Sequence, residues 1–184
     1  MPLPPVNAVT SPLDPASHAA VAHLWEGLER AFGLQLAFAH PVPHLTWHSA
    51  EGYDWKRLRD AMFHVAGDHA PFKVRTGGLG VFVAGQRRVV HLPLVRNDAM
   101  NALHRALWHT LDGVGNAVHP LYAPDVWVPH VTLAAAGVTV DNLAPIVAWL
   151  ADHPFGAEIQ ISRIELIGRD ESGPLRHAFE LGRG

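Results

Sequence analysis

The 184-residue sequence contains no cysteine, which excludes disulfide bonds, zinc–thiolate sites and a cysteine nucleophile. It also lacks an excess of basic residues, since the formal net charge is −3. Proteins that bind long nucleic acids through the phosphates usually have a basic surface, so a short nucleotide or an RNA end is the better expected partner. No apolar run approaches the length of a membrane span, and residues 1–12 lack the basic start of a signal peptide. We expect a cytoplasmic protein, and nothing indicates an obligate protein partner.

The composition is that of a globular protein, with 48% hydrophobic and 17% charged residues. No low-complexity linker divides the chain, so we expect one domain over residues 1–184. Apolar periodicity predicts four helices, at residues 18–32, 54–68, 98–111 and 141–151. Extended segments are expected at residues 6–10, 34–49, 72–76, 79–84, 88–95, 126–136, 159–167 and 175–181. Interleaved helices and strands with a run of consecutive strands predict an α+β fold with largely antiparallel sheets.

Local signals mark where the helices begin and end. Asp14-Pro15 is typical of a helix start, and Gly33 is typical of a helix end. Asp54 and Asp141 are expected to cap the second and fourth helices, and Asn97 or Asp98 the third.

One short motif occurs twice. Residues 42–46 read Val-Pro-His-Leu-Thr and residues 128–132 read Val-Pro-His-Val-Thr. The copies lie 86 residues apart, close to half the chain, and each precedes a predicted helix. The repeat therefore predicts two related, pseudo-symmetric lobes. A duplicated edge strand whose prolines merely end the pairing is the structural alternative.

Side chains on a strand alternate between its two faces. His44 and Thr46 are therefore expected on one face, and His130 and Thr132 on the corresponding face of the second copy. Two such strands would present two histidines and two threonines to one cleft. One histidine could accept a proton from an attacking hydroxyl or water while the other protonates the leaving oxygen. The threonine hydroxyls could hold the non-bridging phosphate oxygens, so the set predicts phosphodiester chemistry that needs no metal or other cofactor.

At these residues the sequence resembles the 2H phosphoesterase superfamily, in particular its 2′-5′ RNA ligases and 2′,3′-cyclic phosphodiesterases. The matching motifs are His44-Leu45-Thr46 and His130-Val131-Thr132, and residues 77–94 resemble the strand–turn–strand segment between the motifs of the family. The resemblance implies a two-lobed fold with a central cleft. It also implies hydrolysis of 2′,3′-cyclic phosphate ends of RNA or nucleotides, with reversible 2′-5′ RNA ligation as a further activity.

The sequence departs from the family where many relatives carry an arginine just after each motif. Trp47-His48 follows the first motif here, and Leu133-Ala134 follows the second. By strand alternation His48 falls on the face of His44, so it is a candidate for binding phosphate or base, with a solvent-facing histidine as the alternative. Tyr122 is a second candidate, for stacking on a base. Trp127 is expected to face away from the cleft.

Other interpretations stay open. A non-catalytic module of the same fold could bind RNA ends or nucleotides. The histidine pairs His44/His48, His64/His69 and His104/His109 could suggest a metal-dependent hydrolase, but their spacing is not that of a zinc site without cysteine. The cluster Gly77, Gly78 and Gly80 indicates a tight hairpin. Arg87-Arg88 indicates a basic turn, which is solvated by default, with contact to RNA as the alternative.

Overall fold

The computed structural model describes residues 7–34, 42–156, 158–170 and 173–182, and of residue 170 the backbone alone. Within these residues nine strands form one antiparallel sheet with the order β11-β10-β1-β2-β8-β6-β4-β9, and β5 pairs with β6. Their bounds are β1 Asn7–Pro12, β2 His44–Ala50, β4 Phe72–Thr76, β5 Gly80–Ala84, β6 Arg87–Val95, β8 His130–Ala134, β9 Glu158–Ile161, β10 Arg163–Asp170 and β11 Gly173–Glu180. A small second sheet joins β3 Gly52–Tyr53 and β7 Gly115–Asn116.

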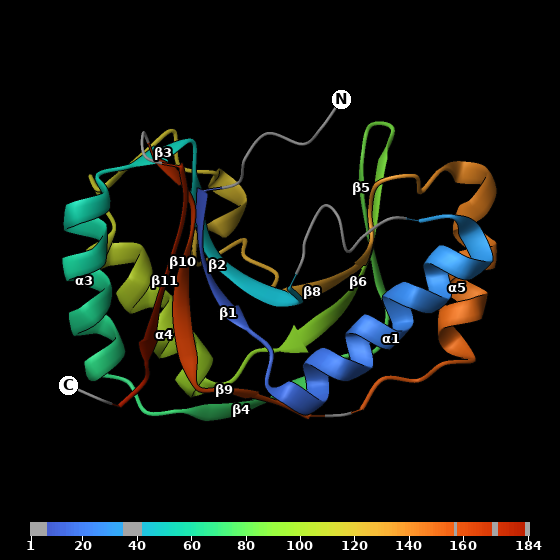
Figure 1. Cartoon of the computed structure of the whole chain (residues 1–184), viewed down its shortest axis with the longest axis horizontal. Helices are drawn as coiled ribbons and strands as arrows, with labels where there is room; N and C mark the ends of the chain where they lie inside the picture. The colour runs from blue at the N-terminus through green and yellow to red at the C-terminus, as the bar shows by residue number, and fades with distance from the viewer. Residues whose placement is uncertain (1–6, 35–41, 157, 171–172, 183–184) are drawn as a thin grey trace.

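In the described part of the chain, the α-helices lie in two groups at opposite ends of the molecule (Figure 1). Helices α3 Trp55–Gly67 and α4 Asp98–Thr110 pack together, and α3 also contacts β10 and β11. Helices α1 Pro15–Phe32 and α5 Val140–Ala151 form the other group, with α1 against β8. The expected α+β fold with largely antiparallel sheets flanked by helices is confirmed.

Helix α1 follows from its local sequence. The Asp14 carboxylate accepts hydrogen bonds from the backbone N–H groups of Ala16 and Ser17, and Pro15 occupies the first turn. Gly33 ends the helix in the left-handed conformation at φ 71°, where a side chain would add strain. The predicted cap and end of this helix are confirmed.

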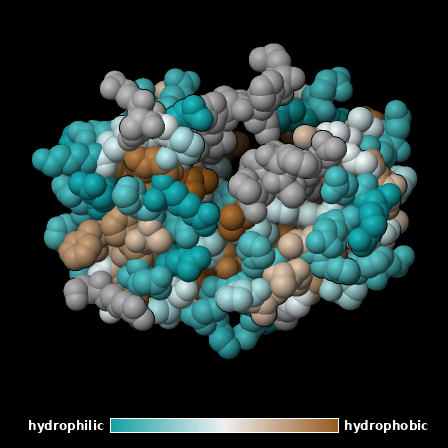
Figure 2. All heavy atoms as spheres, viewed as in Figure 1, coloured by the Kyte–Doolittle hydropathy of each residue, from teal (hydrophilic) through white to brown (hydrophobic). Residues whose placement is uncertain are grey.

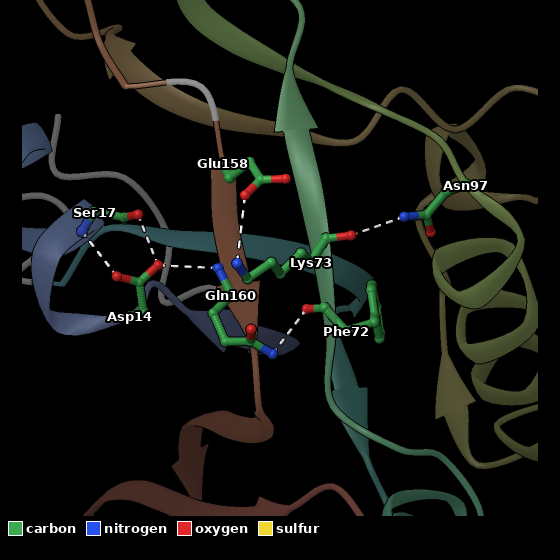
Figure 3. Close-up of polar contacts among 7 residues, drawn as sticks. All are labelled: Asp14, Ser17, Phe72, Lys73, Asn97, Glu158 and Gln160. Carbon is green, nitrogen blue, oxygen red and sulfur yellow. Dashed lines mark hydrogen bonds and ion pairs between the residues drawn. The ribbon is translucent and has the colours of Figure 1, made fainter.

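Strands β4 and β9 each form a hydrogen bond with the residue that caps a helix (Figure 3). Asp14 accepts a hydrogen bond from the backbone N–H of Gln160 on β9 at 3.0 Å. Asn97, the cap of α4, donates from Nδ2 to the carbonyl of Lys73 on β4 at 2.8 Å. The capping side chains therefore connect each helix start to the sheet as well as to its own helix.

Two predicted boundaries are wrong. The cap of α5 is Thr139, not Asp141, because Thr139 and Asn142 exchange hydrogen bonds between side chain and backbone. The single strand expected at residues 159–167 is two strands, β9 and β10, which pair with β4 and β1 respectively. Ser162 stands between them, where the chain passes from one part of the sheet to another. Part of the extended segment expected at residues 34–49 lies outside the described residues.

The core is a continuous set of buried apolar side chains between the sheet and the helices. Trp47, Leu58, Met100 and Ile146 are among the largest side chains that are fully buried. On the face shown in Figure 2, hydrophilic residues cover much of the two flanks, and hydrophobic residues gather between them. None of the described helices is long and apolar enough to cross a membrane.

Candidate active site

The two copies of the motif meet where β2 and β8 pair at the middle of the sheet. The antiparallel register sets Leu45 opposite Val131, the central residue of each motif. In such a ladder each motif histidine lies beside the threonine of the other motif. Both central residues are fully buried, and the histidines and threonines are half-buried on the other face.

All four of these side chains line one cavity of about 490 Å³. Its walls come from β2, β8, the hairpin β5–β6 and the segment 119–128, which contains the short 3-10 helix η1 Pro120–Tyr122. Most of the wall is apolar, and Val83, Leu121, Val126 and Val128 remain exposed at its rim. The cavity therefore combines a polar floor with apolar sides.

In both motif histidines, a hydrogen bond from the Nδ1 atom determines the tautomer of the ring. The Nδ1 of His44 lies 2.7 Å from the carbonyl oxygen of Val42, and the Nδ1 of His130 lies 2.8 Å from that of Val128. A carbonyl can only accept, so Nδ1 carries the proton in each ring. Proton exchange with a ligand would therefore use Nε2. Burial lowers the pKa of His130, although the hydrogen bond to Val128 opposes this shift.

Two buried indoles hold the backbone of the motif threonines. The Nε1–H of Trp127 donates to the carbonyl of Thr46, and the Nε1–H of Trp25 on α1 donates to the carbonyl of Thr132, both at 3.2 Å. Thr46 also shares a side-chain hydrogen bond with Tyr122, whose pKa is raised by burial and lowered to a smaller extent by this bond. The threonines are thus held in place by residues of the cavity wall.

The prediction that His48 shares the face of His44 and Thr46 is wrong. Only 2% of His48 is exposed, and it does not line the cavity. Its Nδ1 lies 2.7 Å from the hydroxyl of Tyr53, and its ring packs at 5.4 Å from that of Trp108. Burial lowers the pKa of His48 to about 4, so this imidazole is a neutral core residue.

A β-bulge explains why alternation failed there. Val9 on β1 pairs with His48, while the next residue, Thr10, pairs with Thr46. Trp47 is therefore an extra residue on β2, and it shifts the alternation by one position. Both Trp47 and His48 consequently turn toward the core.

The second motif has the same irregularity. Val90 on β6 pairs with Ala134, while the next residue, His91, pairs with Thr132. Leu133 is the extra residue, and both Leu133 and Ala134 are fully buried. The two copies therefore correspond in backbone shape as well as in sequence.

The other aromatic candidates lie close to the cavity. Tyr122 lines it, and its carbonyl accepts a hydrogen bond from the Nε2–H of His104 at 3.0 Å. Trp127 also borders the cavity, but only 3% of it is exposed, and it stacks on His104 with ring centroids 3.8 Å apart. Trp127 is thus a packing residue at the edge of the cavity, and the prediction that it faces away from the cleft is wrong.

Sequence reasoning missed two histidines near the motifs and considered Arg87 only as part of a basic turn, with contact to RNA as an alternative. Arg87 and His119 line the cavity, and Arg87 is the one arginine or lysine among its described lining residues. His91 lies behind the wall beside His130. The hairpin that carries Arg87 and His91 was expected, but its approach to the second motif depends on sheet order, which no local signal gives.

No three histidine, aspartate or glutamate side chains in the described part of the chain gather closely enough to hold a metal ion. The pairs His64/His69 and His104/His109 therefore belong to no such group.

The family model of the 2′-5′ RNA ligase superfamily matches residues 13–173. The chain belongs to this superfamily. The matched segment contains both motifs and every residue that lines the cavity. The resemblance to the 2H phosphoesterases seen in the sequence is thereby confirmed, and membership supports a phosphoesterase or ligase-like role in general.

Several solved structures share the fold. TT0787 of Thermus thermophilus superposes with a TM-score of 0.68 at 18% identity, over 97% of this chain and 98% of that one. E. coli LigT in its apo form gives 0.58 at 18% identity, over 97% and 99%. Usb1 of Kluyveromyces marxianus gives 0.54 at 9% identity, over 96% and 98%. Comparison with the sequences of curated proteins gives no match.

Proposed function

We propose that this superfamily member is a metal-independent phosphoesterase that hydrolyses 2′,3′-cyclic phosphate ends of RNA or nucleotides. The observation that carries the proposal is the convergence of His44, Thr46, His130 and Thr132 on one cavity. In this proposal the chain is a single domain over residues 1–184 with two pseudo-symmetric lobes, and it acts in the cytoplasm.

The proposed reaction needs two proton transfers and one phosphate held in place. One motif histidine accepts a proton from water as the water oxygen bonds to phosphorus. The other histidine donates a proton to the ribose oxygen as its bond to phosphorus breaks. The hydroxyls of Thr46 and Thr132 donate to the non-bridging oxygens, where charge must be stabilised. A ribose hydroxyl in place of water would run the same displacement as 2′-5′ ligation.

Ligands of the structural relatives support a nucleotide substrate. LigT has been solved with 3′-AMP and with NADP+, and Usb1 with uridine monophosphate. The apolar walls of the cavity here would suit a base beside the phosphate. Tyr122 is retained in the proposal as a residue that contacts the base.

The direct test uses a short RNA that ends in a 2′,3′-cyclic phosphate, with EDTA present. We expect hydrolysis to a single phosphomonoester, and the position of its phosphate identifies the leaving oxygen. Activity lost in EDTA and restored by a divalent metal would contradict the metal-independent mechanism. Tight binding of the RNA without turnover would favour the non-catalytic binding module, and 2′-5′ linked oligonucleotides would then be tested.

A second prediction concerns Arg87, the positively charged residue that lines the cavity. Arg87 is expected to attract the phosphate-bearing ligand, so Arg87→Ala should raise KM by about tenfold, with a small change in kcat. Arg88→Ala is the matched control, because Arg88 does not line the cavity and donates instead to the carbonyl of Gly85 at 2.9 Å. Steady-state kinetics at low and high salt would measure both. Equal KM values for the two variants would remove Arg87 from substrate binding.

A further inference from the structure

We propose that His91 is a positioning residue that orients the imidazole of His130, with Phe82 completing the aromatic support. The inference rests on the proposed function, because it concerns a histidine proposed to transfer protons. His91 does not line the cavity, so it would act through His130 and not on the substrate.

Three rings pack together at the second motif, and two of them, those of Phe82 and His130, line the cavity. The rings of His91 and Phe82 are stacked, with centroids 3.8 Å apart and planes 15° apart. His130 meets both edge-on, at 5.2 Å from His91 and 4.9 Å from Phe82. Such edge-to-face contacts favour particular ring orientations over others. Together with the Nδ1 bond to Val128, they fix His130 from two sides.

The fold provides room for this stack at Gly80 on β5. Gly80 pairs with His91 across the hairpin, and a Cβ atom at Gly80 would overlap the Nε2 and Cε1 of His91. Gly80 does not have a positive φ, so its backbone conformation does not require glycine. The absence of a side chain is needed instead for close approach of the imidazole.

The supporting imidazole is expected to be uncharged. Only 3% of His91 is exposed, and its Nδ1 lies 3.3 Å from the carbonyl oxygen of Val89. Burial is the main cause that lowers the pKa of His91 to about 4, and the neighbouring His130 adds to it. A neutral ring supports His130 without adding a charge that would oppose its protonation. Besides His130, the titratable groups that line the cavity are His44 on β2, His119 and Tyr122 near η1, and Arg87 on β6.

The equivalent position beside the first motif is different. Thr10 is the residue opposite Thr46, as His91 is opposite Thr132. Thr10 is buried, and its hydroxyl donates to the carbonyl of Glu165 at 3.5 Å. The imidazole of His91 is therefore not required by the shared strand pairing, which supports a role specific to the second motif.

The first experiment compares His91→Ala with His91→Phe. In His91→Ala we expect kcat for the cyclic-phosphate RNA to fall by about ten- to a hundredfold, with little change in KM, because His130 loses its orientation. Water should also reach His130, so its pKa in an NMR titration should rise toward the ordinary value. His91→Phe keeps a neutral aromatic ring and should restore most of kcat and the low pKa. The His130 signals are assigned by their loss in His130→Asn.

A second pair of variants leaves His91 in place. Gly80→Ala should displace the His91 ring and reproduce both effects of His91→Ala. Gly77→Ala is the matched control, because a Cβ atom there would meet Pro93 at an ordinary 3.5 Å. Thermal unfolding would verify that each variant is folded at the assay temperature.

The titration separates this inference from the proposed function. An unchanged His130 titration in folded His91→Ala would overturn the positioning role, whatever the activity. A loss of kcat in His91→Phe as large as in His91→Ala would also overturn it, because packing alone would then be insufficient. Absence of turnover in the wild type would contradict the proposed function, while a shifted titration in His91→Ala would still support the positioning role.

Discussion

Replacing either motif histidine by alanine is expected to lower kcat for a 2′,3′-cyclic phosphate end by at least about a hundredfold. Each removed imidazole takes away one of the two proton transfers, and such transfers contribute about 10²- to 10⁴-fold. His44→Ala and His130→Ala should therefore have similar effects despite their distance in sequence. Single-turnover kinetics with the cyclic-phosphate RNA would measure both without interference from product release.

His48→Ala is not a suitable control for these variants, because His48 is a core residue. His23→Ala is better matched, since His23 is exposed on α1 and lies outside the cavity. It should leave kcat unchanged. Turnover in His44→Ala or His130→Ala equal to that of the wild type, with the fold intact, would remove that histidine from the mechanism. The double variant should be little worse than either single one if the two act in one step.

The sequence predicted those parts of the site that depend on short-range rules. The repeat identified His44 and His130, and alternation over three residues was enough to set each histidine and threonine on a common face. It failed at His48, because a bulge depends on how a strand pairs with its neighbours. The same irregularity occurs twice, since β2 has an extra residue against β1 as β8 has against β6. No property of Trp47 or Leu133 alone indicates the extra residue.

The same distinction applies to the fold. The start and end of α1 were predictable, because Asp14 and Gly33 act on the helix next to them. The division of residues 159–167 into two strands could not be predicted, because apolar residues continue on both sides of Ser162. The two parts differ only in the strands with which they pair. Gly80 was expected both in the extended segment 79–84 and in a glycine cluster typical of a tight hairpin, and it lies within β5. Its reason for being glycine is the ring of His91, eleven residues away in the sequence.

Acidification is expected to lower the stability of the protein well before its carboxylates are protonated. Three histidines, His48, His91 and His104, are at most 3% exposed. Burial is the main cause that lowers the pKa of each to about 4, whereas in the unfolded chain it is about 6.5. Between these values the unfolded chain binds more protons than the folded protein. The stability that depends on these neutral histidines is therefore fully present above about pH 6.5. The free energy of unfolding falls as the pH decreases from there toward 4.

The size of this effect follows from the number of buried imidazoles. A pKa difference of one unit corresponds to about 1.4 kcal/mol per group, so three groups together should remove several kcal/mol by pH 4. Urea unfolding at intervals from pH 7.5 to 4.5 would give the free energy at each pH. His48→Phe isolates one contribution, since it removes a proton-binding site and keeps a buried ring. Its stability should depend less steeply on pH than that of the wild type. Equal slopes for the two proteins would show that His48 is already accessible to protons in the folded state.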